Sequence, residues 1–183
     1  MKKIKFLLIS FMISFWSFNL NAADWTMASG YPKSNFHTQN IMKFIDEVKA
    51  NTSVNINLNP NDTLIKLDAI KTSLQRGQIP IGEIRFGIYG NEDPMYILAG
   101  LPFIAPDYSS AWLLKEVKHE YLQNLFNKKG LRILYTSPWP GQGFYTKTPV
   151  NGVSDFKGKK LRIYSTATQQ MGTMLGFNAT ILP

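Results

Sequence analysis

The sequence contains no cysteine among its 183 residues. This absence excludes disulfide bonds and thiolate metal sites, so the stability must come from an apolar core and from hydrogen bonds. There are only two histidines, His37 and His119, and they lie far apart in the sequence. The chain also has no Gly-x-Ser-x-Gly, no glycine-rich phosphate loop and no His-Glu-x-x-His motif. We therefore expect no metal and no cofactor.

A hydrophobic run long enough to span a membrane is also missing. The longest apolar stretch, Phe6–Phe18, has 13 residues, whereas a membrane-spanning helix needs about 20. It follows the three lysines of Met1–Lys5 and precedes the small residues Ala22 and Ala23. This order predicts a secretory signal peptide over residues 1–23. We expect export to the periplasm of a Gram-negative bacterium and a protein that does not span the membrane after cleavage.

The formal net charge of +8 does not predict a nucleic-acid partner. Three of the lysines belong to the predicted signal peptide, and the remaining cations are scattered in runs of at most two residues. Hydrophobic residues make up 44% of the chain and charged residues 17%, which is typical of a globular protein with a buried core.

The patterns after the signal peptide alternate between strand and helix. Alternating and short apolar stretches predict strands over 24–28, 54–58, 79–84, 131–135, 144–147 and 161–164. Apolar residues at helical spacing predict helices over 36–50, 64–74, 110–117 and 121–126, with another helix after the last strand. This alternation predicts an α/β fold with parallel sheets.

Two prolines and two glycines within residues 138–143 interrupt this alternation and predict a crossover between two lobes. We expect a first lobe over 24–140, a crossover strand or hinge over 141–150, and the start of a second lobe over 151–183. A ligand cleft is expected beside such a crossover.

Arg162 is the leading candidate for a binding residue. It lies between Leu161 and Ile163 in an apolar strand, where an unpaired guanidinium is costly to bury. Tyr164 and Ser165 add hydroxyl groups just before a predicted helix, whose N-terminus favours anions. A carboxylate would suit the guanidinium geometry. The alternative that Arg162 faces solvent from an amphipathic strand remains open.

Residues 153–164, VSDFKGKKLRIY, carry a resemblance to a known family. They are similar to the DLKGLKxR signature of the substrate-binding proteins of TRAP transporters, the tripartite ATP-independent periplasmic transporters of the DctP family. Shorter matches lie upstream in the same order: Gly30–Pro32 with Phe36 and His37, Arg76–Gln78, Ile81–Glu83, Leu101–Phe103 and Gly143–Tyr145. The resemblance implies a periplasmic-binding-protein-like fold with two hinged α/β lobes and parallel-rich sheets.

The resemblance also implies a function without catalysis. A receptor of this family captures a small carboxylate-containing solute and delivers it to integral membrane transporter subunits. Arg162 matches the arginine that binds the ligand carboxylate, and Ser165 matches a polar ligand contact. The other implied or candidate ligand-binding residues are Tyr164, Glu83 and Asn91, the loop residues Tyr31, Phe36 and His37, and Trp139 and Tyr145 near the crossover. Tyr145 replaces an arginine of sialic-acid-type members, which argues against a sialic acid ligand.

Several alternatives remain open at this point. Glu83 could cap a helix, and the aromatic residues could belong to an ordinary core. The protein could also be an exported periplasmic hydrolase, or a sensor or ligand-binding module that is not coupled to transport. Members of the resembled family continue well past residue 183, so we expect a C-terminally truncated chain with an incomplete second lobe.

Overall fold

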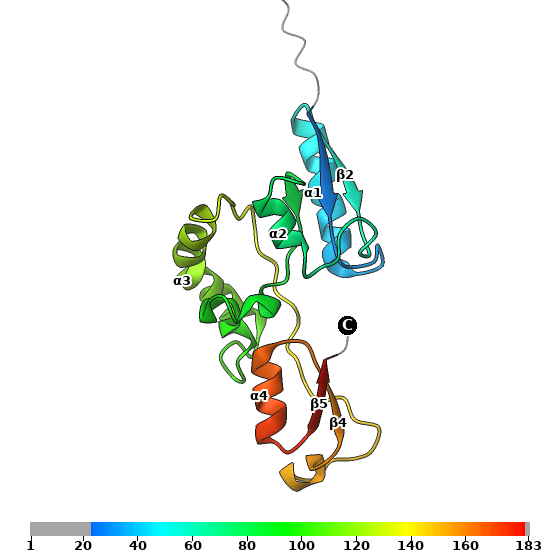
Figure 1. Cartoon of the computed structure of the whole chain (residues 1–183), viewed down its shortest axis with the longest axis vertical. Helices are drawn as coiled ribbons and strands as arrows, with labels where there is room; N and C mark the ends of the chain where they lie inside the picture. The colour runs from blue at the N-terminus through cyan, green and yellow to red at the C-terminus, as the bar shows by residue number, and fades with distance from the viewer. Residues whose placement is uncertain (1–22, 182–183) are drawn as a thin grey trace, which may run out of the picture.

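The computed structural model of the chain describes residues 23–181 (Figure 1). The predicted signal peptide therefore lies outside the described residues, except for Ala23. Two separate parallel sheets are present in residues 23–181, one with the strand order β2-β1-β3 and one with the order β4-β5. Figure 1 shows the two sheets toward opposite ends of an elongated molecule. Within the described part of the chain, no helix is long and apolar enough to cross a membrane.

The first sheet forms as predicted around one strand–helix–strand unit. Strand β1, Ala23–Ala28, pairs along its whole length with β2, Val54–Asn59, and helix α1, Phe36–Asn51, connects them. The third strand, β3, contains only Ile81–Gly82, so the predicted strand over 79–84 is much shorter than expected. Pro80 contributes to this, because proline has no N–H to donate to a neighbouring strand.

Apolar side chains hold helix α1 and a second helix against the first sheet. Ile41 of α1 packs in a buried cluster with Met27, Ile56 and Ile81 from the three strands. A second buried cluster joins Ala28 of β1 to Ile70 and Ile79. Ile70 begins helix α2, Ile70–Gln75. The central strand therefore buries one residue toward α1 and the next toward α2, as strand alternation requires.

Helix α2 is shorter than the predicted helix over 64–74. The carboxylate of Asp62 accepts a hydrogen bond from the backbone N–H of Leu67, and Ala69 N–H donates to Lys66 O. These local bonds favour turns over residues 63–69 instead of a helix. The helix ends at Gln75, one residue after the predicted end, and Gly77 follows it with a positive φ of 67°.

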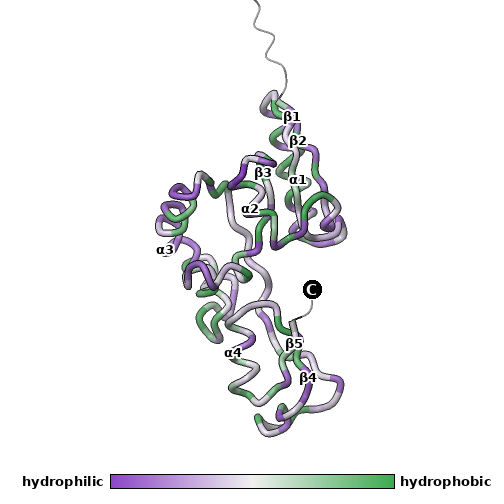
Figure 2. Tube along the Cα trace, in the orientation of Figure 1, coloured by the Kyte–Doolittle hydropathy of each residue, from purple (hydrophilic) through white to green (hydrophobic). Residues whose placement is uncertain are grey.

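Three 3₁₀ helices, Phe86–Tyr89, Pro94–Tyr96 and Leu98–Gly100, lead into the long helix α3, Tyr108–Asn127. The two predicted helical runs over 110–117 and 121–126 are thus one continuous helix. Its N-cap is Asp107, whose carboxylate accepts a hydrogen bond from Ser110 N. In Figure 2 hydrophilic and hydrophobic residues mix around the turns of α3.

The strands predicted over 131–135 and 144–147 are wrong. Both segments are extended but unpaired between α3 and the second sheet within the described residues. An apolar alternating pattern favours an extended backbone, but a strand also needs a hydrogen-bonded neighbour. This long extended connection runs from α3 to the second sheet (Figure 1).

The second sheet is one further strand–helix–strand unit. Strand β4, Lys160–Ile163, pairs in parallel with β5, Asn178–Ile181, and helix α4, Thr166–Met174, connects them. Helix α4 packs against one face of the sheet, because a Cβ on Gly172 would lie 3.1 Å from Leu161 Cδ2 and 3.4 Å from Ala179 Cβ. A triad of phenylalanine rings closes the outer end of this unit: Phe144, Phe156 and Phe177, with centroids 4.6–5.6 Å apart.

Candidate functional site

The carboxyl ends of the first-sheet strands bring together two polar residues that are 54 positions apart in the sequence. Ser29 directly follows β1, and Glu83 directly follows β3. The Glu83 N–H donates to Ala28 O at 2.9 Å, and the Ser29 hydroxyl donates to Glu83 Oε2 at 2.5 Å. Burial raises the pKa of Glu83, and the Ser29 hydrogen bond opposes this shift. Ligands of open α/β sheets bind at this end of the strands.

Four aromatic rings gather next to this point, and we call them the aromatic cluster: Tyr31, Phe36, His37 and Trp139. The Trp139 ring centroid lies 4.4 Å from that of His37, 5.2 Å from that of Tyr31 and 5.3 Å from that of Phe36. Asn35 fixes the start of α1 by accepting a hydrogen bond from His37 N. The structure thus joins all four predicted residues, one of them from the distant crossover segment.

The aromatic cluster is not part of the buried core clusters of the first lobe. Phe36 is 45% exposed and Trp139 is 40% exposed, whereas His37 is only 5% exposed. A set of rings that is buried at its base and open at its edge provides stacking surface for a small molecule. The aromatic cluster is therefore separate from the buried core, and its exposed ring edges are accessible at the surface.

Three buried polar atoms in this region have no hydrogen-bond partner among the described protein atoms. They are the Tyr31 hydroxyl, His37 Nε2 and Arg85 Nε. Burial raises the pKa of Tyr31, while the positive charges of Arg85 and Arg162 oppose that rise. Burial lowers the pKa of His37. An unpaired buried polar group costs about 1–3 kcal/mol, and such groups concentrate at functional sites.

Two arginines from different lobes lie against the ring of Tyr164. The guanidinium carbon of Arg162 is 5.7 Å from the ring centroid, and that of Arg85 is 5.6 Å from it. Arg162 is exposed, while its neighbours Leu161 and Ile163 turn toward the covered face of β4. Arg162 is therefore solvent-accessible, as one of the two alternatives expected. It lies on the exposed face of β4, next to Tyr164, whose ring Arg85 also contacts.

Among the described residues, no side-chain hydrogen bond or ring contact joins Ser165, Asn91 or Tyr145 to Arg85, Arg162 or the Tyr164 ring. Ser165 is the N-cap of α4, and its hydroxyl accepts a hydrogen bond from Thr168 N at 3.2 Å. Asn91 is exposed, and its side chain makes no hydrogen bond within residues 23–181. Tyr145 is 91% exposed. Their roles in ligand binding remain predictions.

Sequence reasoning missed Arg85 and Ser29. Arg85 lies between Ile84 and Phe86, a cation between two apolar residues like Arg162, and this signal could have identified it. Ser29 gave no such signal, because a serine before a glycine is typical of any turn.

Close packing brings the two lobes together beside Asn91. A Cβ placed on Gly90 would lie 3.1 Å from the hydroxyl oxygen of Thr166 and 2.4 Å from Ile97 Cγ2. Thr166 is the first residue of α4. The 3₁₀ segment of the first lobe therefore meets the N-terminus of the second-lobe helix.

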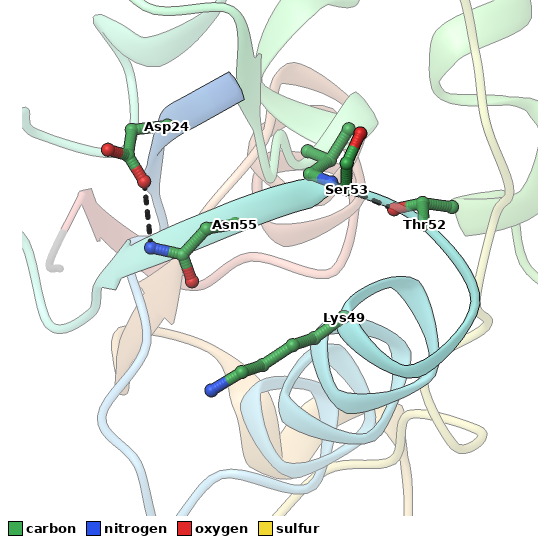
Figure 3. Close-up of a pocket in the computed structure, with 6 residues that line it drawn as sticks. Asp24, Lys49, Thr52, Ser53 and Asn55 are labelled. Carbon is green, nitrogen blue, oxygen red and sulfur yellow. Dashed lines mark hydrogen bonds between the residues drawn. The ribbon is translucent and has the colours of Figure 1, made fainter. Parts of the chain in front are cut away.

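A surface hollow at the other end of the first sheet differs from this region in its polar contacts. One is lined by Asp24, Lys49, Thr52, Ser53, Val54 and Asn55 (Figure 3). There Asn55 Nδ2 donates to Asp24 Oδ1 at 2.9 Å, so the polar groups already pair with each other. This hollow lies at the amino ends of β1 and β2, opposite the end where parallel sheets bind ligands. We do not assign it a ligand.

The hydrolase alternative requires a nucleophile activated by a neighbouring base. His37, the histidine that would act as the base, has aromatic neighbours, and no hydroxyl lies within hydrogen-bond distance of its Nε2 in the described structure. The geometry gives this alternative no support.

The described part of the chain consists of two parallel α/β units joined by an extended connection, with polar and aromatic groups gathered at the carboxyl end of the first sheet. The comparisons specify the family. The chain belongs to the DctP family, the bacterial extracellular solute-binding proteins of family 7, whose model matches residues 27–183.

Solved structures of extracytoplasmic receptors share this fold. The Bordetella pertussis receptor DctP7, which binds pyroglutamic acid, is 37% identical with a TM-score of 0.84, and the match covers 88% of this chain and 54% of that one. A marine metagenome TRAP solute-binding protein specific for pyroglutamate is 34% identical, with the same TM-score and coverage. The ectoine-binding protein of Halomonas elongata, at 20% identity and a TM-score of 0.75, supports the fold alone.

The chain spans about half the length of these solved structures. No curated protein sequence matches the chain.

Proposed function

We propose that the protein is an extracytoplasmic receptor that captures a small organic acid and delivers it to the membrane subunits of a TRAP-type secondary transporter. The observation that carries this proposal is Arg162, which has no acidic partner among the described residues and faces Tyr164. Family membership and the similarity to receptors for pyroglutamic acid support the same class of ligand.

In this proposal the ligand binds between a first lobe over 24–140 and a second lobe that begins at residue 151. Arg162 pairs with the ligand carboxylate, the aromatic cluster packs against the ligand body, and Glu83 accepts a hydrogen bond from a ligand donor. A ligand that touches both lobes favours the closed form by its difference in affinity for the closed and open forms. The residues over 141–150 act as the hinge, and export by the signal peptide places the receptor in the periplasm.

The test is a binding titration of the purified chain with pyroglutamate, measured by the fluorescence of Trp139 in a variant that carries Trp16→Phe, Trp25→Phe and Trp112→Phe, so that Trp139 is its single tryptophan. We expect Arg162→Ala to weaken binding about tenfold to a hundredfold, because a charge-assisted hydrogen bond is worth about 1.5–3 kcal/mol. The matched control is Arg132→Ala, which removes an exposed arginine outside the aromatic cluster. Equal affinity of the parent and Arg162→Ala for pyroglutamate and a panel of other acids would refute the carboxylate role.

A further inference from the structure

Arg85 is a cation of the first lobe that reaches the second lobe. It follows the short strand β3 by three residues and lies between Ile84 and Phe86, which both pack against apolar clusters. The side chain is half-buried, and its guanidinium carbon lies 5.6 Å from the centroid of Tyr164. This cation–π contact joins Arg85 to the residue that directly follows β4.

Arg85 has no acidic partner among the described residues. The four ion pairs found within residues 23–181 all take their cation from a lysine. Glu83, two residues earlier, accepts its hydrogen bond from Ser29. Arg85 Nε is buried without an acceptor. A guanidinium has five N–H donors, so this side chain presents unused donors at a protein interface.

Arg162 faces the same tyrosine ring from the second lobe, with its guanidinium carbon 5.7 Å from the centroid. Two cations beside one ring repel each other, and the ring alone offsets only part of this cost. An anion with a single acceptor group satisfies one guanidinium. A ligand with acceptor groups at two positions satisfies both, one from each lobe.

We propose that Arg85 is a second ligand-binding residue and that it makes the receptor prefer acids with a second oxygen acceptor, such as another carboxylate or a ring carbonyl. Arg162 binds the first carboxylate, and Arg85 donates to the second acceptor. This inference rests on the proposed function, because it names the class of organic acid that the same site binds.

The experiment compares two matched pairs of acids by the single-tryptophan titration described above. Glutarate and pentanoate differ in the second carboxylate, and pyroglutamate and cyclopentanecarboxylate differ in the ring amide. In the parent we expect the first acid of each pair to bind at least about tenfold more tightly than the second, as for one charge-assisted hydrogen bond. Arg85→Met keeps the apolar stem and removes the donors.

With Arg85→Met the affinity for glutarate and pyroglutamate should fall about tenfold, while the affinity for pentanoate and cyclopentanecarboxylate should change less than about twofold. An equal loss for both members of each pair would show a structural role and overturn the proposal. So would an unchanged preference. Arg85→Lys, which keeps the charge without the planar donor set, provides a second variant if Arg85→Met does not fold.

The two proposals fail in different ways. A parent chain that binds pentanoate as tightly as glutarate, and cyclopentanecarboxylate as tightly as pyroglutamate, keeps the receptor function and overturns the role of Arg85. A parent chain that binds none of the four acids, and no other acid of a broad panel, overturns both.

Discussion

The first sheet is covered on both faces, whereas the second sheet is covered on one. In the first lobe α1 packs against Met27 and Ile56, and α2 brings Ile70 against Ala28 on the other side. In the second, α4 packs over Leu161 and Ala179, and the opposite face, which carries Arg162 and Thr180, stays exposed. The same strand–helix–strand unit therefore builds a core in one lobe and leaves a cation accessible in the other.

The largest effect on stability is expected where α2 packs against the first sheet. Ile70 is fully buried, and Ile70→Ala should lower the free energy of unfolding by about 3 kcal/mol, through lost transfer energy and a cavity. Urea denaturation of the purified chain measures this change. The matched control is Val117→Ala on the exposed face of α3, which should change stability by less than about 0.5 kcal/mol. Equal effects of the two variants would mean that α2 does not close this sheet.

A smaller and more local effect is expected in the second lobe. Phe177→Ala removes one buried ring of the phenylalanine triad and should cost about 2 kcal/mol, because the neighbouring Phe144 ring is 42% exposed and can relax into the space. Amide hydrogen exchange should accelerate in β4 and β5 and stay unchanged in β1. If β1 accelerates to the same extent, the two lobes unfold as one unit and the comparison of two separate cores is wrong.

The smallest effect concerns pH and His37. Burial lowers the pKa of His37 from its ordinary value of 6.5, so the unfolded chain binds a proton before the folded chain does as the pH falls. The contribution of His37 to stability is complete above pH 6.5 and is lost as the pH falls toward the folded pKa. The slope is at most about 1.4 kcal/mol per pH unit.

Urea denaturation of the parent and of His37→Gln at pH values from about 7 down to about 5 measures this effect. The parent should lose stability faster than the variant. The matched control for replacing a histidine by glutamine is His119→Gln, at an exposed position. Identical pH profiles for the parent and His37→Gln would contradict the buried position of this ring. Burial raises the pKa of Glu83, so that residue has the opposite effect, favouring stability at lower pH.

The elements that sequence patterns predicted correctly are those with local determinants. Helix α1 has a capping Asn35 and apolar residues at helical spacing, and β1 and β2 alternate. The segment over 131–135 has an equally clear pattern, but a strand depends on a partner that the pattern cannot supply. Asp62 similarly shortened α2 through a hydrogen bond to a backbone group five residues away.

Site residues were predictable from the sequence where a charged side chain lies between apolar neighbours. Arg162 was predicted because it is a cation in an apolar strand, and the aromatic residues were predicted from the family resemblance. The contact of Trp139 with His37 could not be read from the sequence, because it depends on the path of an unpaired segment more than a hundred residues away. Arg85 shows the converse, since its local signal was present in the sequence, whereas its contact with Tyr164 depends on the packing of the two lobes.

Gly90 determines how closely the first lobe can approach the start of α4. A β-carbon there would come within 3.1 Å of Thr166 and closer still to Ile97, so any other residue would act as a wedge between the first lobe and the start of α4. Because Gly90 has no side chain, the backbone of the first lobe can lie directly against the start of α4. The close approach of the two lobes at this point therefore depends on the absence of a single atom.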